Sequence, residues 1–368
     1  MRIIQVVNIR PYNAAAWYAL TLSRLLRDAG HDVLVVTLRD SETERVALEA
    51  GLRVEPLELS TLNPLAVPGL YARMRRLARS FAPHIVNCHR GEAFLLWGLL
   101  RRESKGFKLV RTRGEQSLPQ DNLPNRMLHR HAADAIIVTN SSIGSHFRHL
   151  LRVPKDKLWV IYGGVDPERH RFDPQGRCRI RAEFGYGEQD FVIGLLGRFD
   201  KSKGQREIIG SVASLRHDFD LRHIRLLLLG REASTSLSQV KAWIDEEGIA
   251  EVTSISGLRP DIPACISALD AAALPNRLPG AISRAALELM ACGCPTVASE
   301  VGVLPDLFSE KALVQPGDVP ALTVSLARLA RHEHFRQELR REQHGTIAQL
   351  TEKDFLLQTL SVYEALLS

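Results

Sequence analysis

Short apolar runs alternate with longer amphipathic stretches along the first half of the chain. The apolar runs occupy residues 3–9, 31–38, 84–89, 108–113 and 134–140. Their branched apolar residues are typical of strands buried on both faces of a sheet. Between the first two runs, residues 14–29 carry apolar positions at helical spacing, and Gly30 follows as a helix-ending residue. This alternation predicts a doubly wound parallel sheet with right-handed helical crossovers.

The second half repeats the pattern after an interruption. Residues 167–190 are charged and contain Pro167, Pro174, Gly176, Gly185 and Gly187, which indicates a loop-rich linker. Strand-like runs then return at residues 191–198, 224–231, 252–258 and 270–276. The sequence therefore predicts two α/β domains, residues 1–166 and 167–348, facing each other across a cleft. An amphipathic helix over residues 349–368 is expected to pack back on the first domain.

Composition narrows the class of protein. The chain has 368 residues, 45% hydrophobic and 24% charged, as in an ordinary globular protein of two domains. No apolar run approaches the roughly 20 residues that span a bilayer, and the first residues run into a strand without a signal-peptide pattern. The five cysteines form no CxxC pair, which indicates reduced thiols without a zinc site. We therefore expect a cytoplasmic protein.

The net charge of +6 arises partly from arginines interleaved with apolar residues over residues 71–81 and 99–113. No nucleic-acid-binding motif accompanies them, so a nucleic-acid partner is not expected. A basic surface suits nucleotide phosphates or the anionic inner face of a membrane. The alternative is that these arginines form solvated helix faces.

Ligands of open parallel sheets bind beyond the carboxyl ends of the strands. In the second half, the loop 197–204 offers Gly197, the cations Arg198 and Lys203, and a following helix N-terminus, which suits a diphosphate. Further along, Glu288 is the one acid in a run of Ala, Leu and Met. Such a carboxylate is either solvated at one edge of its helix or bonded to a specific partner.

Taken in order, the second-half blocks resemble the retaining glycosyltransferases of family 4, which have the GT-B architecture of two Rossmann-like domains and use nucleotide-sugar donors. The resemblance rests on VIYGGVDPERHRF (160–172), GLLGRFDKSKGQREIIGSVASL (194–215), ISGLRPDIPACISALDAAALPN (255–276) and ALELMACGCPTVASEVGVLPDL (286–307). The first half matches this family more loosely.

The resemblance implies roles for individual residues. Arg198 and Lys203 match the pair that grips the donor diphosphate, and Glu288 matches the glutamate that binds the ribose. The region around Leu258 lies where the family's backbone contacts the base. Residues placed at the donor by this resemblance are Asn13, Ala14, Gly197, Arg198, Lys203, Arg231, Leu258, Gly280, Ala281, Ile282, Ser283 and Glu288. The competing interpretation is that Arg198 and Lys203 merely close a surface loop.

The chain departs from the family pattern at three places. The sugar-facing glutamate of the family is replaced by Gly280, the aromatic residue two places later by Ile282 and the next glycine by Ser283. The Gly-Gly pair after the first strand is replaced by the region of Asn13 and Ala14. The family's histidine near one strand end corresponds to Arg113, and we expect Arg113 and His89 to face the cleft. A lone histidine at a strand end is otherwise a structural hydrogen-bonding residue.

The resemblance thus implies sugar transfer to an acceptor hydroxyl with retention, with Arg198, Lys203, His89 and Arg113 as catalytic residues. No metal or permanently bound cofactor is expected, and the donor is a UDP-, GDP- or ADP-sugar. A glycan or lipid-linked glycan is the expected acceptor, in polysaccharide or lipopolysaccharide biosynthesis. Peripheral contact with the inner membrane face is expected as well. The alternatives are a degenerate nucleotide-sugar-binding subunit, motivated by Gly280, and a nucleotide-sugar epimerase.

Overall fold

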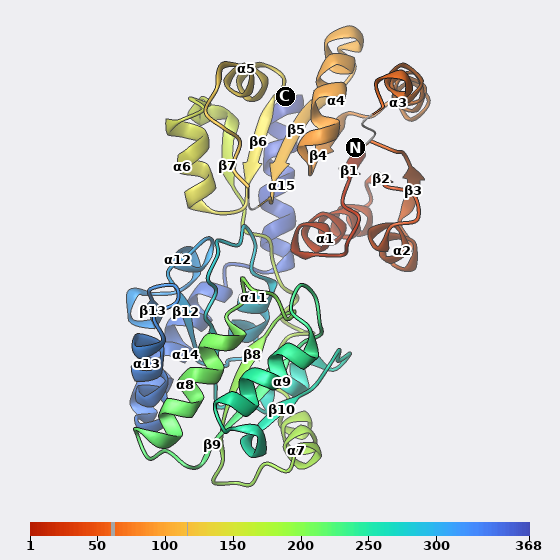
Figure 1. Cartoon of the computed structure of the whole chain (residues 1–368). Helices are drawn as coiled ribbons and strands as arrows, with labels where there is room; N and C mark the ends of the chain where they lie inside the picture. Colours follow the sequence, from red (N-terminus) through yellow and green to blue (C-terminus); the bar gives the residue numbers. More distant parts are fainter. Residues whose placement is uncertain (60–62, 116) are drawn as a thin grey trace. The chain divides into compact units, whose positions relative to one another are not determined.

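The computed structural model describes residues 1–59, 63–115 and 117–368 (Figure 1). These residues form two compact units, residues 1–163 together with 352–368, and residues 164–351. The chain thus passes into the second unit after Gly163 and returns after Thr351, where the sequence pattern placed the divisions after residues 166 and 348. Each unit is described by itself below.

The first unit is built on a parallel sheet with strand order β3-β2-β1-β4-β5-β6-β7 in its described part. The strands are β1 (Arg2–Val7), β2 (Asp32–Thr37), β3 (Arg53–Pro56), β4 (Ile85–Cys88), β5 (Lys108–Arg113), β6 (Ala135–Val138) and β7 (Leu158–Val160). Every residue of β4 and β6 is buried, as expected for strands covered on both faces.

Helices connect these strands and cover the sheet (Figure 1). They are α1 (Ala14–Asp28), α2 (Glu42–Glu49), α3 (Val67–Phe81), α4 (Gly91–Ser104), α5 (Leu123–His131) and α6 (Ser141–His149), with 3-10 turns at Pro64–Ala66 and Lys155–Lys157. The final helix α15 (Glu352–Leu367) also belongs to this unit. Tyr363 of α15 accepts hydrogen bonds from Gln5 Nε2 at 3.3 Å and Asn87 Nδ2 at 2.9 Å, which ties α15 to β1 and β4.

The second unit repeats the architecture with strand order β10-β9-β8-β11-β12-β13 in a parallel sheet. Its strands are β8 (Phe191–Leu196), β9 (Ile224–Leu229), β10 (Thr253–Ile255), β11 (Ala271–Leu274), β12 (Thr296–Ser299) and β13 (Leu313–Val314). Its helices are α7 (Pro174–Glu183), α8 (Gln205–His217), α9 (Leu237–Glu246), α10 (Ile262–Ser267), α11 (Arg284–Ala291), α12 (Leu304–Leu307), α13 (Val319–Arg331) and α14 (Glu333–Ile347), with 3-10 turns at Ala250–Val252 and Glu310–Ala312.

The expected linker over residues 167–190 is wrong in one respect, because it contains helix α7. Pro174 stands in the first turn of α7, where its missing N–H is harmless, and Asp173 Oδ1 accepts the N–H of Gly176 at 2.9 Å as the helix cap. Proline and glycine, taken from the sequence as loop signals, therefore belong to the start of a helix.

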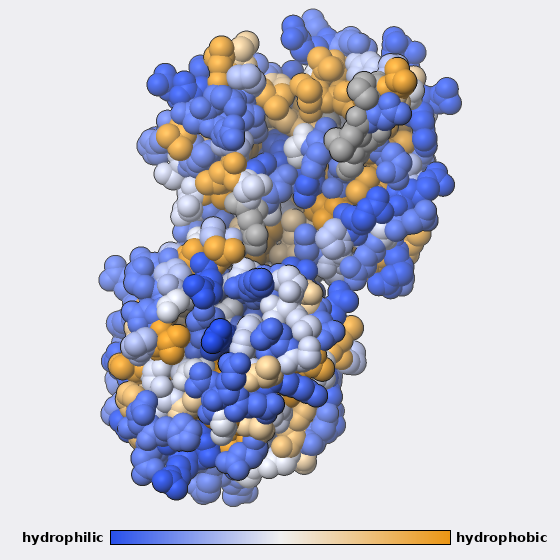
Figure 2. Space-filling view, viewed as in Figure 1, coloured by the Kyte–Doolittle hydropathy of each residue, from blue (hydrophilic) through white to orange (hydrophobic). Residues whose placement is uncertain are grey.

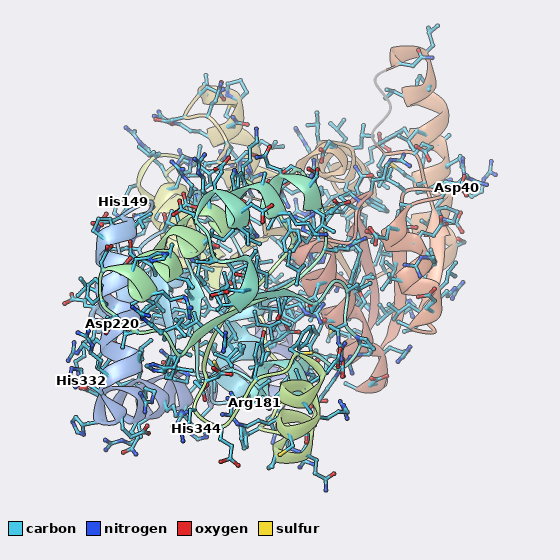
Figure 3. All side chains as sticks on the ribbon, turned by 60° about the horizontal axis from the view of Figure 1, so that its bottom comes forward. Asp40, His149, Arg181, Asp220, His332 and His344 are labelled. Carbon is cyan, nitrogen blue, oxygen red and sulfur yellow. The ribbon has the colours of Figure 1, made fainter. Side chains whose placement is uncertain are left out.

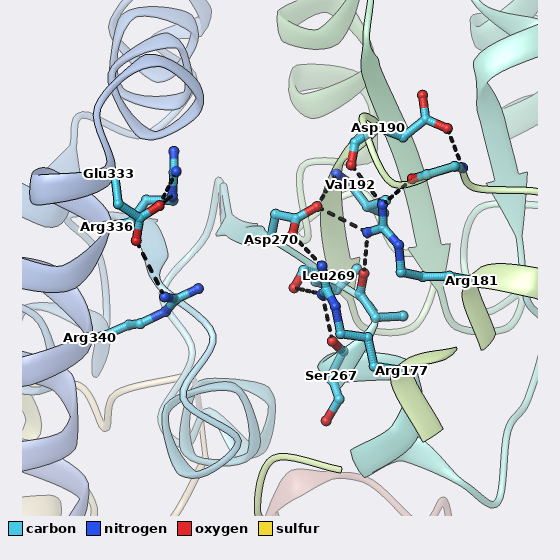
Figure 4. Close-up of polar contacts among 12 residues, drawn as sticks. Arg177, Arg181, Asp190, Val192, Ser267, Leu269, Asp270, Glu333, Arg336 and Arg340 are labelled. Carbon is cyan, nitrogen blue, oxygen red and sulfur yellow. Dashed lines mark hydrogen bonds and ion pairs between the residues drawn. The ribbon is translucent and has the colours of Figure 1, made fainter. Parts of the chain in front are cut away.

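Asp270 anchors α7 to the middle of the second sheet (Figure 4). Its two oxygens lie 2.7 Å from Arg177 and 3.1 Å from Arg181, and Oδ2 also accepts the N–H of Val192 at 2.8 Å. Arg181 is buried, and Figure 3 shows it on α7. Because Asp270 precedes β11 and Val192 lies in β8, this cluster of charges joins the amino ends of the two central strands.

In each sheet the strand order reverses once, between β1 and β4 in the first unit and between β8 and β11 in the second. Such a reversal is the topological switch point at which open α/β sheets bind ligands, beyond the carboxyl ends of the strands. A functional site is therefore expected in the loops that follow these four strands.

Candidate functional site

The loops after β8 and β11 meet at the switch point of the second sheet. The N–H of Arg277 donates to the carbonyl oxygen of Ser202 at 2.9 Å. Gly204, at φ +75°, allows the Pro275 carbonyl to approach so closely that a Cβ on Gly204 would lie 2.0 Å from that oxygen. Arg277 also forms an ion pair with Glu207 at 2.9 Å. The loop 197–204 and the turn 275–283 thus form one surface.

Two cations lie on this surface, Arg198 exposed and Lys203 half-buried. Burial lowers the pKa of Lys203, and the nearby charge of Arg198 lowers it further. The Lys203 N–H donates to the Asp200 carbonyl at 2.8 Å, and Gln205 Nε2 donates to the Arg198 carbonyl at 2.9 Å, so the loop backbone is fixed. Two like charges held close together in this way favour a bound anion, which would relieve their repulsion.

The loops after β9 and β10 complete the carboxyl edge. Gly230 packs against the backbone of Gly197, since a Cβ on Gly230 would lie 1.9 Å from the Gly197 oxygen. The Phe199 N–H donates to the Arg231 carbonyl at 2.7 Å, and Gly230 pairs with Gly257 in an antiparallel bridge. Arg231 is exposed, and Leu258 is 77% exposed.

The turn before α11 is buried from Gly280 to Ser283. The Gly280 carbonyl accepts the N–H of Val303 at 3.0 Å, and a Cβ on Gly302 would lie 2.5 Å from the Gly280 nitrogen. Ser283 caps α11, with its Oγ 3.4 Å from the Ala286 nitrogen. One N-terminal N–H group of α11 is therefore already directed at a side chain.

Glu288 is buried on α11 and is bonded to specific partners, so it is not a solvated helical glutamate. Its Oε1 lies 2.7 Å from Arg284 Nε, one helical turn earlier, and 3.4 Å from His170 Nε2. Burial acts to raise the pKa of Glu288, but the hydrogen bond from His170 and the charge of Arg284 outweigh it and hold the pKa below its usual value. Both of these contacts fall on Oε1.

In the first unit, His89 follows β4 and is 2% exposed. Its Nε2 lies 2.7 Å from Gln5 Oε1, and Gln5 is held in turn by Tyr363. Burial, together with the charge of Arg111, lowers the pKa of His89 to about 3, so its imidazole is neutral at physiological pH. Of the two interpretations that the sequence left open, these contacts fit the structural hydrogen-bonding histidine.

Arg113 ends β5 and is 7% exposed. It pairs with Glu115 at 2.7 Å, and the same carboxylate also contacts Arg111. Burial lowers the pKa of Arg113 to about 10, and Arg111 adds to this effect against the opposing charge of Glu115. Its Nε is buried without a hydrogen-bond partner among the described residues. Two arginines therefore share one carboxylate at the end of β5, and the N–H group at Arg113 Nε can still donate a hydrogen bond.

The loop after β1 ends at Asn13, which caps α1. Asn13 Oδ1 accepts the N–H groups of Ala15 at 3.0 Å and Ala16 at 3.1 Å. Ala14 is partly exposed beside this cap. The first helix thus directs two of its N-terminal N–H groups at its own cap, as α11 does with one.

The structure brings the loop 197–204 into contact with Pro275 and Arg277 at the start of the turn before α11. It also adds two residues that the sequence interpretation missed. His170 and Arg284 hold Glu288. Arg284 was detectable from its spacing of four residues before Glu288. His170 lies in the block at residues 160–172 that carried part of the resemblance, but its contact with α11 depends on the fold. Asn13, Ala14, His89 and Arg113 belong to the first unit.

Among the residues that the structure describes, no helix has both the length and the apolar character needed to cross a bilayer.

Comparison with known proteins identifies the type of protein. Residues 15–169 match the model of the family described as Glycosyltransferase Family 4, and residues 190–332 match that described as Glycosyl transferases group 1. A GDP-mannose-dependent alpha-(1-6)-phosphatidylinositol monomannoside mannosyltransferase of Mycolicibacterium smegmatis is 27% identical over 302 residues, with 78% of this chain and 77% of that protein covered. A D-inositol 3-phosphate glycosyltransferase of Saccharomonospora viridis is 30% identical over 57% of this chain, which spans 50% of that relative.

Solved structures agree on the fold. The structure of the Anabaena protein HepE in complex with UDP matches with a TM-score of 0.85 at 18% identity, covering 99% of this chain and all of that one. Together with the two parallel α/β units and the matched family models, this likeness leads to one conclusion. The chain belongs to the GT-B glycosyltransferases of family 4 type, with a glycosyl transferases group 1 domain as its second unit.

Proposed function

We propose that this protein transfers a sugar from a nucleoside-diphosphate sugar to an acceptor hydroxyl, with retention at the anomeric carbon and without a metal ion. One observation carries the proposal. Arg198, Lys203 and the buried, oriented Glu288 belong to the loops and helix that follow the two central strands at the switch point of the second sheet.

The charges on this edge suit the chemistry of the donor. Arg198 and Lys203 neutralise the diphosphate as it leaves, which is the largest charge that develops in the reaction. The backbone of Gly197 and of Gly280, Ala281, Ile282 and Ser283 lines the phosphates and the sugar. Glu288 accepts ribose hydroxyls on Oε2, and Arg231 and Leu258 border the base. In the first unit, we assign Asn13 and Ala14 to the donor phosphates and Arg113 to the sugar and acceptor, whereas His89 has the structural role described above.

For the acceptor we propose a lipid-linked glycan at the inner membrane face, in the synthesis of cell-surface polysaccharide or lipopolysaccharide. The mannosyltransferase relative is named for a phosphatidylinositol monomannoside acceptor, which supports a lipid-linked substrate. Helix α3 presents Arg73, Arg75, Arg76 and Arg79 to solvent. Leu65, just before α3, is 88% exposed, and Leu123 on α5 is 67% exposed. Apolar patches lie on the first unit in Figure 2. Basic and exposed apolar groups together are typical of contact with anionic membranes.

The decisive assay combines a donor panel with a lipid-linked acceptor. The intact protein is incubated with UDP-, GDP- and ADP-sugars and with extracted lipid-linked glycans, and the product linkage is assigned by NMR. We expect transfer from one donor class, with the anomeric configuration of the donor kept. An inverted linkage would contradict the retaining mechanism. The Lys203→Ala variant should bind the donor more weakly and transfer far less sugar than the parent.

A second candidate is a degenerate subunit that binds nucleotide sugar without turnover. Gly280, which replaces the family's sugar-facing glutamate, favours it, as do the capped N-termini of α1 and α11. The two candidates differ in one readout. A subunit of this kind shows donor binding by thermal shift with neither transfer nor donor hydrolysis over the whole donor and acceptor panel.

A further inference from the structure

The first sheet is hollowed at the opposite ends of its strands from His89 and Arg113. There, α3, α4 and the amino ends of three strands enclose a cavity of about 310 Å³. Among its lining residues are Arg2 at the start of β1, His84 just before β4 and Phe107 just before β5. The N-terminus of the chain, α3 and α4 gather at this end of the unit (Figure 1). Because β1, β4 and β5 are parallel, the cavity and the strand-end residues of the proposed active site lie at opposite ends of the same strands.

Three guanidinium groups border the cavity. Arg75 and Arg79, one turn apart on α3, form no hydrogen bond or ion pair with another described residue, and both are exposed. Arg2 donates through Nε to the Ala82 carbonyl at 2.6 Å, so its two terminal nitrogens keep their donor capacity. Of the described lining residues, Glu103 is the one carboxylate. The cavity therefore has three cations against one anion.

His84 reports the same excess of positive charge. Its Nδ1 accepts the N–H of Arg2 at 2.8 Å, so the imidazole meets the positive end of a peptide group. Burial lowers the pKa of His84, and the charges of Arg2 and the amino terminus lower it further. The protein thus disfavours one more positive charge at this point, which is the condition under which an anion is attracted.

We propose that this cavity binds a phosphate-bearing anion through Arg2, Arg75 and Arg79. A guanidinium presents a planar fork of donors that matches phosphate oxygens, and Arg75 and Arg79 offer two such forks from one helix face. The volume is at the lower end of the range of about 300–1,000 Å³ found for small-molecule pockets, so a compact phosphorylated molecule or a lipid headgroup fits and a large ligand does not. The cavity shares no residue with the proposed donor site, whose first-unit members Asn13, Ala14 and Arg113 lie at the opposite ends of the strands.

The proposal is tested with pyrophosphate as the probe. Because pyrophosphate also suits the proposed donor site, the titrations use the full chain in the Arg198→Ala/Lys203→Ala background, by calorimetry at low ionic strength. We expect one equivalent to bind, and either Arg75→Glu or Arg79→Glu to weaken binding at least tenfold. The matched control is Arg73→Glu, which makes the same charge change on the same helix but does not line the cavity, and we expect a change below threefold.

Circular dichroism of each variant verifies that helix and sheet content are unchanged. Competition by vesicles of phosphatidylcholine with phosphatidylglycerol identifies a lipid headgroup as the natural ligand, whereas pyrophosphate binding that vesicles leave unaffected identifies a free phosphate compound. The proposal is overturned if the background protein binds no pyrophosphate, or if Arg73→Glu weakens binding as much as Arg75→Glu, since a diffuse basic surface would then account for it. None of these results depends on sugar transfer.

Discussion

His170 Nε2 lies 3.4 Å from Oε1 of Glu288, the same oxygen that Arg284 Nε contacts at 2.7 Å. His170 and Arg284, which lie far apart in the sequence, therefore both hold the buried Glu288 carboxylate through Oε1. The other oxygen, Oε2, is the one that we propose binds the ribose of the donor.

Glu288→Ala is expected to weaken donor binding by about tenfold or more. A hydrogen bond to a charged group contributes about 1.5–3 kcal/mol, and 1.4 kcal/mol corresponds to a tenfold change in affinity. His170→Ala should weaken binding less, because it removes a group that positions Glu288. Calorimetric titration of the parent and both variants measures the effect. Equal affinity in all three proteins would exclude Glu288 as a ribose ligand.

Lys203→Ala should reduce both donor affinity and turnover, because Lys203 is assigned to the diphosphate in the ground state and in the transition state. Lys203→Arg keeps the charge and should recover part of the loss. Initial rates over a range of donor concentrations separate KM from kcat. The comparison control is Lys201→Ala, an exposed lysine in the same loop, for which we expect little change. A Lys201→Ala loss as large as that of Lys203→Ala would argue for a general charge effect.

Gly280→Glu tests the missing sugar-facing carboxylate. A Cβ on Gly280 would meet its nearest atom, the Ile282 oxygen, at 3.7 Å, an ordinary contact, so the backbone accepts a side chain there. We expect the variant to fold as the parent does and to shift the ranking of donor sugars in the transfer assay, while the ranking of nucleotide bases stays the same. An altered base preference would place Gly280 at a different part of the donor.

Gly204→Ala should destabilise the second unit strongly, because the added Cβ would lie 2.0 Å from the Pro275 oxygen at a positive φ. We expect a loss of more than about 2 kcal/mol, beyond the centre of the usual mutational range. Gly248→Ala is the control, since Gly248 shares a positive φ of 64° but no atom lies within 4 Å of its added Cβ. Urea unfolding of both variants measures the difference. Similar losses of unfolding free energy in the two variants would mean that the close approach of Gly204 to Pro275 does not affect stability.

His89 should make the first unit sensitive to acid. Its pKa is lowered from 6.5 to about 3, so the unfolded chain takes up a proton below pH 6.5 that the folded chain does not. Stability therefore falls as the pH falls from 6.5 towards 3, by about 1.4 kcal/mol per pH unit for this one proton. His89→Gln keeps a donor for Gln5 and removes the titration, so its stability should depend less on pH. Parallel slopes for parent and variant between pH 4 and 6.5 would contradict the buried neutral histidine.

The sequence was sufficient for the central strands of both sheets, because buried parallel strands appear as short branched apolar runs, as at residues 134–140, where β6 forms over Ala135–Val138. The two-residue edge strand β13 was not anticipated. It was not sufficient for α7. There Pro174 and Gly176 have the composition of a loop, and only the cap by Asp173 and the clamp on Asp270 show that they start a helix. The helix α2 was not anticipated either, because eight largely polar residues carry little periodicity.

For the candidate site, residue types and order gave Arg198, Lys203 and Glu288, but not what surrounds them. The partnership of Glu288 with His170 joins segments that are distant in the sequence. The burial of His89 depends on Gln5 and on Tyr363 in the last helix, a contact that no local pattern contains. Local chemistry can therefore be predicted from spacing, whereas pKa values and orientation depend on packing between distant segments.

The central claim is tested most directly by a crystal structure of the protein with its nucleotide-sugar donor. We predict that the diphosphate lies within hydrogen-bonding distance of Arg198 and Lys203, and that the ribose hydroxyls lie within hydrogen-bonding distance of Glu288 Oε2, with Oε1 still held by Arg284 and His170. A donor bound away from the carboxyl ends of β8 and β11, or a ribose without contact to Glu288, would contradict the account.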